Sequence, residues 1–417
     1  MPFYKRNLIT CIRWILILWQ HQNAKMQQEG LRQTAPAQAN GKILVAGAAG
    51  GNWADSPQPV TANNGHSFAK AIEHVFAAHG ENKFISYNNL PPDVPKTKTK
   101  SNSKGVLMMD ITGNDAAAWI VHTVPGFPKA RTGYLFPPAE VQKGHLLICL
   151  TIKEDQIDTI ALTLRFATPL IYYNDIPNAQ MDSRPNLKKL VSGELKILPP
   201  LTVTQDTTTA APAALKVTIY SKGEKSRYEI YRKILLKKLK STIKVWTARD
   251  NKLKSDCRIF GKNIRLVTSP ISVNGDQSTL ENDVSQWLVT ETGNKFCAVD
   301  KPYQKSQTME PTMAVCIDDA TISARFKEIA QNQHQNAKMQ QEGLRQTAPA
   351  QANGKILVAG AAGGNWADSP QPVTANNGHS FAKAIEHVFA AHGENKFISY
   401  NNLPPDVPKT KTKSNSK

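Results

Sequence analysis

Histidine is the side chain best suited to acid–base chemistry near neutral pH, and it is scarce in the unique part of this chain. Outside two copies of a repeated segment, only His122 and His145 occur. Within the repeat, Glu73-His74 and His79 miss the H-E-x-x-H spacing of a zinc site, because their separation puts the two histidines on different faces of a helix. The residues therefore predict no metal site, and His122 is interpreted either as a packed structural residue or as the border of a site.

Glycine-rich loops that bind phosphate are not evident in the sequence. Residues 47–51 (G-A-A-G-G) contain neither G-x-G-x-x-G nor G-x-x-x-x-G-K-[ST], the arrangements that turn backbone amides toward a phosphate. A flexible turn is the better interpretation of this segment. No nucleophile elbow of the G-x-S-x-G type occurs either. We therefore expect no cofactor.

Positive charge is concentrated in one segment. The 417-residue chain has 51 Lys+Arg and 33 Asp+Glu, a formal charge of +18, and residues 222–265 alone hold 15 basic and 4 acidic residues. This balance favours polyanionic partners such as DNA. Apolar residues at helical spacing predict a helix over 226–241. Its basic residues, on and around the polar side, are Arg232, Lys233, Lys237, Lys238 and Lys240. This face is solvated, contacts phosphate or binds a membrane surface.

The composition, 40% hydrophobic and 20% charged, is that of a globular protein and excludes a disordered or fibrous one. Helical spacing recurs over 68–76, but short apolar runs bounded by Pro, Gly and Asn are more numerous. These runs predict strands at 84–87, 106–109, 119–121, 146–152, 160–166, 170–173 and 215–220. We therefore expect an α+β fold, with a linker or exposed loop over 199–212 between two structural halves.

An exact duplication determines the domain plan. Residues 20–104 recur unchanged as residues 333–417, at an offset of 313. Repeat folds use diverged units of about 20 to 50 residues, so one long perfect copy indicates a recent duplication or a fused gene model. We expect the structured domain to be 20–332 and the second copy to be an incomplete unit. A functional second half-domain is the alternative.

The first 19 residues are a candidate signal or anchor segment. An apolar run from Leu8 to Trp19 follows Lys5 and Arg6, as in a signal peptide, but Arg13 interrupts it. At about 12 residues the run is too short for a transmembrane span, which needs roughly 20. We therefore expect no transmembrane span, and the choice between a secretory signal and an anchor stays open.

Several blocks of the sequence resemble one family of nucleases. They are 84–92 (F-I-S-Y-N-N-L-P-P), 104–110 (K-G-V-L-M-M-D), 119–128 (W-I-V-H-T-V-P-G-F-P), 144–149 (G-H-L-L-I-C), 221–223 (S-K-G), 245–246 (V-W), 255–257 (S-D-C) and 295–297 (K-F-C). The block V-H-T-V-P-G-F-P is the most specific. From about Gly41 to about Cys316, the chain resembles the deoxyribonuclease II family, including its plancitoxin-like members.

This resemblance implies an acid endonuclease that hydrolyses double-stranded DNA without a divalent metal. It implies two phospholipase-D-like halves with mixed β-sheets and flanking helices, here about 41–200 and 213–332. Each half supplies an H-x-K motif. In that chemistry one neutral imidazole attacks phosphorus, a protonated one donates to the leaving oxygen, and the lysines stabilise the developing charge.

In this chain both motif histidines are replaced. The first motif aligns with Asn102-Ser103-Lys104 and the second with Gly293-Asn294-Lys295, so both lysines remain. We therefore expect catalysis to be weakened or lost, as in a pseudoenzyme. The alternative within this frame is an enzyme that uses His122 with Lys104 and Lys295. A different alternative is a non-catalytic secreted protein that binds DNA or another polyanion, and a homo-oligomer is left open.

The cysteines bear on the compartment. The family's opening strand and cysteine, expected before Gly41, are not recognisable, which leaves Cys149 and Cys257 without their usual partners. Cys297 and Cys316 are expected to form a disulfide if the protein is secreted. By resemblance to the family, we expect the protein to be secreted or lysosomal.

Overall fold

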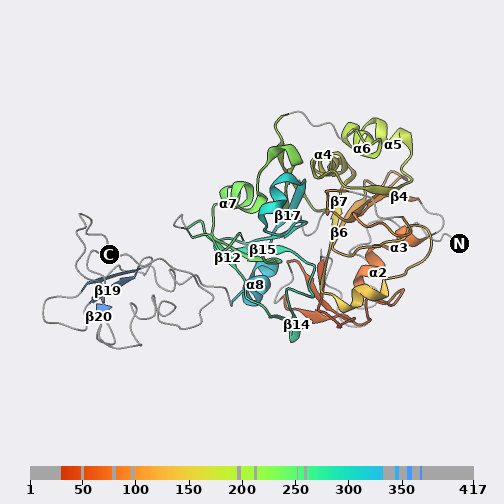
Figure 1. Cartoon of the computed structure of the whole chain (residues 1–417). Helices are drawn as coiled ribbons and strands as arrows, with labels where there is room; N and C mark the ends of the chain where they lie inside the picture. The colour runs from red at the N-terminus through yellow and green to blue at the C-terminus, as the bar shows by residue number, and fades with distance from the viewer. Residues whose placement is uncertain are drawn as a thin grey trace. The chain divides into compact units, whose positions relative to one another are not determined.

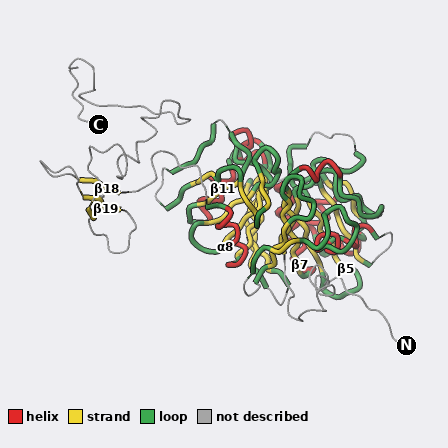
Figure 2. The backbone as a smooth tube through the Cα atoms, turned by 90° about the horizontal axis from the view of Figure 1, so that it is seen from below, coloured by secondary structure: helices red, strands yellow, loops and turns green. Residues whose placement is uncertain are grey.

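The computed structural model describes residues 30–331, except for gaps at 48–50, 78–80, 95–98, 195–198, 211–213, 251 and 258–260, and three strands further along the chain. The candidate signal segment, 1–19, lies outside the described residues. The chain divides into two compact units, residues 1–334 and 335–417. Figures 1 and 2 show the first unit as sheets flanked by helices and joined by long loops. The expected α+β fold is confirmed.

The first half of this unit is built on an eight-stranded sheet in the order β3-β2-β1-β7-β6-β5-β4-β8. Its strands are β1 (Gly30–Thr34), β2 (Lys42–Val45), β3 (Ala54–Asp55), β4 (Asn82–Tyr87), β5 (Gly105–Asp110), β6 (Ala117–His122), β7 (His145–Ile152) and β8 (Ile171–Asn174). Neighbouring strands pair antiparallel. Strand β5 is buried along its whole length, because both faces of the sheet are covered.

The second half is built on a seven-stranded sheet in the order β12-β11-β15-β16-β17-β10-β9. Its strands are β9 (Thr202–Thr208), β10 (Lys216–Lys222), β11 (Ile243–Trp246), β12 (Ile264–Leu266), β15 (Trp287–Thr290), β16 (Lys295–Val299) and β17 (Thr312–Asp318), and a separate hairpin joins β13 (Ile271–Val273) to β14 (Asp276–Ser278). Strands β11 and β12 pair parallel, so this sheet is mixed.

The two sheets share one strand plan. The order β1-β7-β6-β5-β4 in the first matches β10-β17-β16-β15-β11 in the second, with the same order along the chain. The match extends to single hydrogen bonds. The backbone N–H of His122 donates to Lys104 O (3.2 Å) just before β5, and that of Val299 donates to Gln286 O (2.9 Å) just before β15. Gln286 is therefore the counterpart of Lys104.

Helices cover the sheets. They are α2 (Ser67–Ala71), α3 (Glu73–Phe76), α4 (Ile157–Ala167), α5 (Asn178–Asp182), α6 (Pro185–Val191), α7 (Leu236–Leu239) and α8 (Ala320–Ile329), with a π-helix at Tyr231–Leu235. Helix α4 lies between β7 and β8 of the first sheet in sequence, yet it packs on β9, β10 and β17 of the second. One core cluster accordingly contains Trp119, Leu164, Trp287 and Phe326, so the halves share an interior.

Two expectations for irregular or extended segments were wrong. Residues 160–166 form part of α4, whose buried Ile157, Ile160, Ala161 and Leu164 lie at helical spacing; their helical period outweighs the strand propensity of single residues. Residues 202–208 are not a linker but the edge strand β9, paired with β10 over its whole length. Its threonines suit an edge strand with one solvated face.

The expected helices are shorter than predicted. Helix 68–76 is divided at Ile72 into α2 and α3. Helix 226–241 reduces to the π-helix and α7, and it ends at Lys240 in the left-handed region (φ 53°). Tyr228, expected on the apolar stripe, is 46% exposed.

Strand β1 supplies the opening strand that was not recognised before Gly41. It lies inside the first sheet between β2 and β7, with Gly30 opposite Val45 on one side and Cys149 on the other. The second copy of its sequence forms β18 (Gly343–Gln346), β19 (Lys355–Val358) and β20 (Ala367–Asp368). There Gly343 pairs with Val358, the same register shifted by 313 residues.

Candidate functional site

The loop that leads into β5 carries the first set of candidate residues. Ser101 and Ser103 are buried, whereas Asn102 and Lys104 are partly exposed. The hydroxyl of Ser103 donates to the carboxylate of Asp300, which follows β16 in the second half. The loop is therefore anchored on alternate residues, and Asn102 and Lys104 are the ones that solvent or a ligand can reach.

A glycine is required where this loop becomes a strand. A Cβ atom added to Gly105 would lie 2.3 Å from Ile120 O and 2.4 Å from the hydroxyl oxygen of Tyr87. Tyr87 in turn accepts a hydrogen bond from the indole N–H of Trp119 (2.9 Å). The tight packing at Gly105 fixes the backbone beside Lys104.

The Lys104 ammonium lies in a charged but enclosed environment. Its Nζ donates to Asn102 O at 3.1 Å. Burial and the nearby Lys301 lower the pKa of Lys104 to about 8, against the opposing effects of Asp300 and Glu140. Burial also raises the pKa of Asp300. Lys301 is itself held by the carboxylate of Glu310 and by Lys100 O (2.6 Å).

His122 follows the same pairing register as Lys104 and is buried. Its Nδ1 accepts from the backbone N–H of Val124 (3.2 Å), so the neutral ring carries its proton on Nε2. That Nε2 is buried without a hydrogen-bond partner. Burial and the neighbouring Lys104 and His145 lower the pKa of His122 to about 3. The ring is thus a neutral donor across the acid range, with no lone pair at Nε2 and no second proton to give.

His145 is fully buried and both ring nitrogens are engaged. Its Nε2 donates to Glu140 O (3.0 Å), and its Nδ1 accepts from the hydroxyl of Thr123 (3.2 Å). The carboxylate of Glu140 lies 3.2 Å from the same Nε2. This arrangement is that of a satisfied structural histidine.

The second half presents a different set of residues at the corresponding place. Gln286 stands where Lys104 stands in the first half, and Val284 stands where Asn102 stands. Val284 is partly exposed and Gln286 is buried, with Gln286 Oε1 accepting from the backbone N–H of Ala248 (3.0 Å). The backbone N–H of Val284 donates to Gly144 O (3.0 Å), which ties this loop to the first half.

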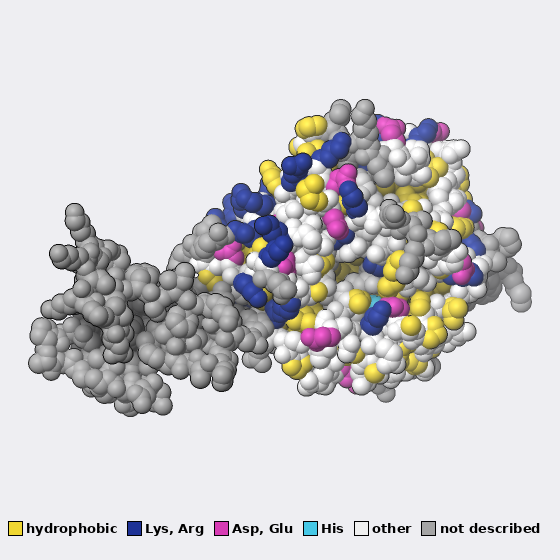
Figure 3. All heavy atoms as spheres, in the orientation of Figure 1, with side chains coloured by type: hydrophobic (Ala, Val, Ile, Leu, Met, Phe, Trp, Pro, Cys, Tyr) yellow, Lys and Arg dark blue, Asp and Glu magenta, His cyan; other side chains and the backbone are white. Residues whose placement is uncertain are grey.

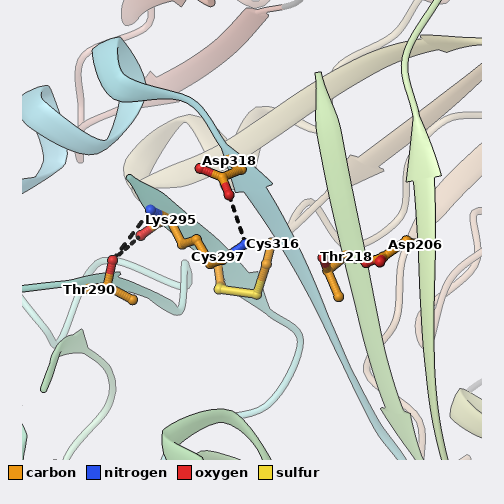
Figure 4. Close-up of a disulfide and its surroundings, with 7 residues drawn as sticks. All are labelled: Asp206, Thr218, Thr290, Lys295, Cys297, Cys316 and Asp318. Carbon is orange, nitrogen blue, oxygen red and sulfur yellow. Dashed lines mark hydrogen bonds and ion pairs between the residues drawn. A yellow bond between two sulfur atoms is a disulfide. The ribbon is translucent and has the colours of Figure 1, made fainter. Parts of the chain in front are cut away.

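Lys295, the other lysine singled out in the sequence, lies at the far end of β16. Its Nζ contacts the carboxylate of Asp318 at 2.9 Å, beside the Cys297–Cys316 disulfide (Figure 4). Asp300, which contacts the Lys104 loop, lies five residues after Lys295, just beyond the other end of β16. At about 3.3 Å per residue, this separates the two backbone positions by about 16 Å. The structure therefore brings Lys104 together with His122 and Asp300, and it does not bring Lys295 to them.

The basic residues around α7 form a positive surface. Lys233, Lys237, Lys238 and Lys240 are exposed and make no ion pair with another described residue. Arg232 is instead paired with Asp256, at 2.9 Å. Figure 3 shows Lys and Arg side chains gathered over the part of the second half where α7 lies. We call Lys233, Lys237, Lys238 and Lys240 the α7 lysines.

Disulfides reinforce the sheets. Cys297 and Cys316 lie directly opposite each other on β16 and β17 and are bonded. Cys149, expected to lack its partner, is also disulfide-bonded. Among the described residues, no three His, Cys, Asp or Glu side chains are grouped as metal ligands. No helix in this part of the chain is both long and apolar enough to span a bilayer.

Comparison with known proteins assigns the chain to a family. The model of the deoxyribonuclease II family matches residues 30–336. The chain belongs to the deoxyribonuclease II family. The match begins at β1, so the family's domain includes the strand that the sequence alone did not reveal.

Curated relatives in the deoxyribonuclease II family are distant. Plancitoxin-1 of Acanthaster planci is 27% identical over 270 residues, which are 63% of this chain and 74% of the plancitoxin. Deoxyribonuclease-2-beta of Rattus norvegicus is 23% identical over 295 residues, 66% of this chain and 78% of the rat protein. Deoxyribonuclease-2 of Caenorhabditis elegans is 26% identical over 175 residues, 42% of this chain and 45% of the nematode protein.

Three residues of the site were missed from the sequence. Asp300, Lys301 and Gln286 belong to the second half, and none lies in a motif that the sequence reveals. Gln286 becomes visible only through the matching strand order of the two sheets. Its neighbour Trp287, at the start of β15, is the one sequence signal near it.

Proposed function

We propose that this deoxyribonuclease-II-family protein binds DNA through phosphate contacts and has lost, wholly or nearly, the family's acid cleavage of it. The observation that carries the proposal is the correspondence of Lys104 with Gln286. Two residues before each of them, Asn102 and Val284 occupy the places where the family's histidines are expected. Neither an amide nor an isopropyl group attacks phosphorus or protonates a leaving oxygen.

His122 and His145, the two histidines outside the repeated segment, support this proposal. His122 is held as a neutral donor, and His145 is buried with both nitrogens engaged. Loss of catalytic groups that act as a unit costs on the order of a millionfold in rate. Retained electrostatic stabilisation from Lys104 does not offset a loss of that size.

Positive charge supports retention of the ligand. Two of the relatives are named deoxyribonucleases, which act on DNA, and phosphate contacts are independent of base sequence. Lys104 is partly exposed, so its ammonium is the donor of this loop that a phosphate oxygen can approach. The α7 lysines add exposed charge that is not neutralised by described carboxylates. We assign the contacts with the DNA phosphates to Lys104 and to the α7 lysines.

A secreted or lysosomal location is part of the proposal. Disulfides persist in oxidising compartments and are rare in the cytosol, and both Cys297–Cys316 and the bonded Cys149 fit that rule. Fractionation of cells that express the full chain would test it, with recovery in the medium or in lysosomes as the expected result.

The test of function is plasmid nicking and gel retardation by the full chain, in chelator, from about pH 4.5 to 7.5. We expect retardation without nicking. Nicking in the acid range that is abolished by His122→Ala would overturn the proposal in favour of an enzyme that uses His122. If the plasmid is neither nicked nor retarded, DNA is excluded as the ligand.

A restoration experiment sharpens the test. The triple variant Asn102→His/Val284→His/Gln286→Lys rebuilds both motifs at the structurally corresponding positions, and we expect it to gain measurable acid nicking. The matched control, Asn102→His/Gly293→His, rebuilds the second motif beside Lys295 and is expected to stay inactive. Nicking by the control alone would contradict the assignment of Gln286.

A further inference from the structure

The surroundings of the Lys104 amine differ from those of Lys295, Lys301 and Lys222. Lys295 and Lys301 are paired with Asp318 and Glu310, whereas no described carboxylate lies within 4.0 Å of Lys104 Nζ. Lys222 also lacks such a pair, but it is fully buried and donates to three backbone carbonyls. Lys104 is partly exposed and donates only to Asn102 O. It is therefore both reachable and only weakly held.

Three charged residues and one neutral histidine face Lys104. Lys301 disfavours its protonated form, Asp300 and Glu140 favour it, and His122 is neutral. Burial and Lys301 together set the pKa at about 8. The unprotonated share of this amine near neutral pH is therefore larger than that of an ordinary lysine. Burial beside a second cation is a known way to activate a lysine as a nucleophile.

We propose that Lys104 forms a Schiff base with an aldehyde, and that this aldehyde is the ring-opened sugar of an abasic site in DNA. The choice of DNA rests on the function proposed above. Intact DNA carries no aldehyde, whereas a sugar that has lost its base exposes one at C1′ between two phosphates.

The chemistry balances without an oxidant or reductant. The lone pair of Nζ attacks C1′, the carbonyl oxygen takes up two protons and leaves as water, and a protonated imine remains. Water then removes a proton from C2′, the C2′–C3′ double bond forms and the C3′–O bond breaks, with the phosphate as leaving group. Hydrolysis of the imine returns the Lys104 amine. The strand is cut beside the lesion, with no attack on phosphorus.

The test traps the imine with sodium borohydride. The full chain is incubated at pH 7.5 with a labelled duplex oligonucleotide that contains one abasic site, and covalent adducts are counted on a denaturing gel. We expect an adduct that maps to Lys104, that is at least about tenfold weaker with Lys104→Arg, and that is unchanged with the exposed control Lys188→Arg. Adduct formation should rise with pH toward about 8, which a purely structural lysine would not produce.

A second probe separates this inference from the proposed function. Free 2-deoxyribose 5-phosphate and borohydride should label Lys104 in the native chain, as read by peptide mapping. Labelling of Lys104 without retardation of DNA would support a reactive amine but refute DNA as the source of the aldehyde. Retardation without an adduct at Lys104, or an adduct of equal strength in Lys104→Arg, would overturn the inference itself.

Discussion

The hydroxyl of Ser103 donates a hydrogen bond to the carboxylate of Asp300, which joins the first motif loop to the end of β16 in the other half. Asp300 also accepts from the backbone N–H of Met313 (2.9 Å). Both donors are buried, so the carboxylate satisfies groups that water does not reach. The position of Lys104 therefore depends on a residue 196 positions later in the chain.

Removal of this carboxylate should destabilise the fold. We expect Asp300→Ala to lower the free energy of unfolding by about 2–4 kcal/mol, because it leaves the Ser103 hydroxyl and the Met313 N–H buried and unpaired. Asp182→Ala, which removes an exposed ion pair with Lys188, is the control and should change it by less than about 1 kcal/mol. Denaturant titration measures both, and equal effects would contradict the role of Asp300.

The backbone beside Lys104 should not tolerate a side chain at Gly105. Gly105→Ala places a methyl group against Ile120 O and the Tyr87 hydroxyl, so we expect a loss of about 3 kcal/mol or more in stability. Gly223→Ala is the matched control, because its nearest neighbour, Leu201 O, lies 3.8 Å away. Thermal unfolding distinguishes them. A stable Gly105→Ala variant would show that the loop adjusts more easily than its packing indicates.

Acid should weaken the fold through its buried histidines. The pKa of His122 is lowered to about 3 in the folded state, and the unfolded value is about 6.5. Between these values the unfolded state binds more protons, so stability is lost as pH falls from about 6.5 toward 3. At pH 4.5 we therefore expect His122 to lower the free energy of unfolding by about 3 kcal/mol.

Comparison of unfolding at pH 7 and pH 4.5 checks this contribution. His122→Asn, which keeps an acceptor for the Val124 N–H but does not titrate, should narrow the difference between the two pH values. His66, whose pKa is lowered to about 4 by burial and Arg32, acts in the same direction and should leave part of the difference in place. If the difference in stability between pH 7 and pH 4.5 is the same in His122→Asn as in the native chain, the pKa of His122 in the folded protein is not lowered as far as its burial indicates.

The α7 lysines should determine the salt dependence of DNA retention. Each phosphate contact contributes about 0.9 to the slope of log K against log salt. We expect Lys237→Ala/Lys238→Ala/Lys240→Ala to reduce this slope by about 2 to 3. Lys295→Ala, which removes a lysine already paired with Asp318, should reduce it by less than 1. A slope that does not change in the triple variant would exclude the surface around α7 as the DNA contact.

Strands β4 to β8 and β10 could be predicted from the sequence, and the failures elsewhere have physical causes. Strands β4 to β7 are short apolar runs with β-branched and aromatic residues, which is how buried strands are recognised. Residues 160–166 contain the same residue types, and only the spacing of Ile157, Ile160 and Leu164 reveals α4. The polar strands β1 and β9 are stabilised by pairing with β7 and β10, respectively. Their own residues therefore do not show that they form strands.

The candidate site was predictable only in its first half. Lys104 lies in a contiguous block of family residues, so sequence likeness is enough to find it. In the second half the likeness attaches to Lys295 before Phe296-Cys297, whereas the strand plan and the Val299–Gln286 hydrogen bond place the counterpart of Lys104 one strand earlier, at Gln286. A partial match in one strand cannot reveal which strand is structurally equivalent.

The repeated three-stranded meander shows which residues determine the register of one part of the first sheet. Strands β18, β19 and β20 pair in the same register as β1, β2 and β3, although β1 is also paired with β7 and the repeated segment ends before β7 begins. The register is thus encoded within the segment itself. Strand β7 therefore pairs with an edge of the sheet whose register does not depend on it.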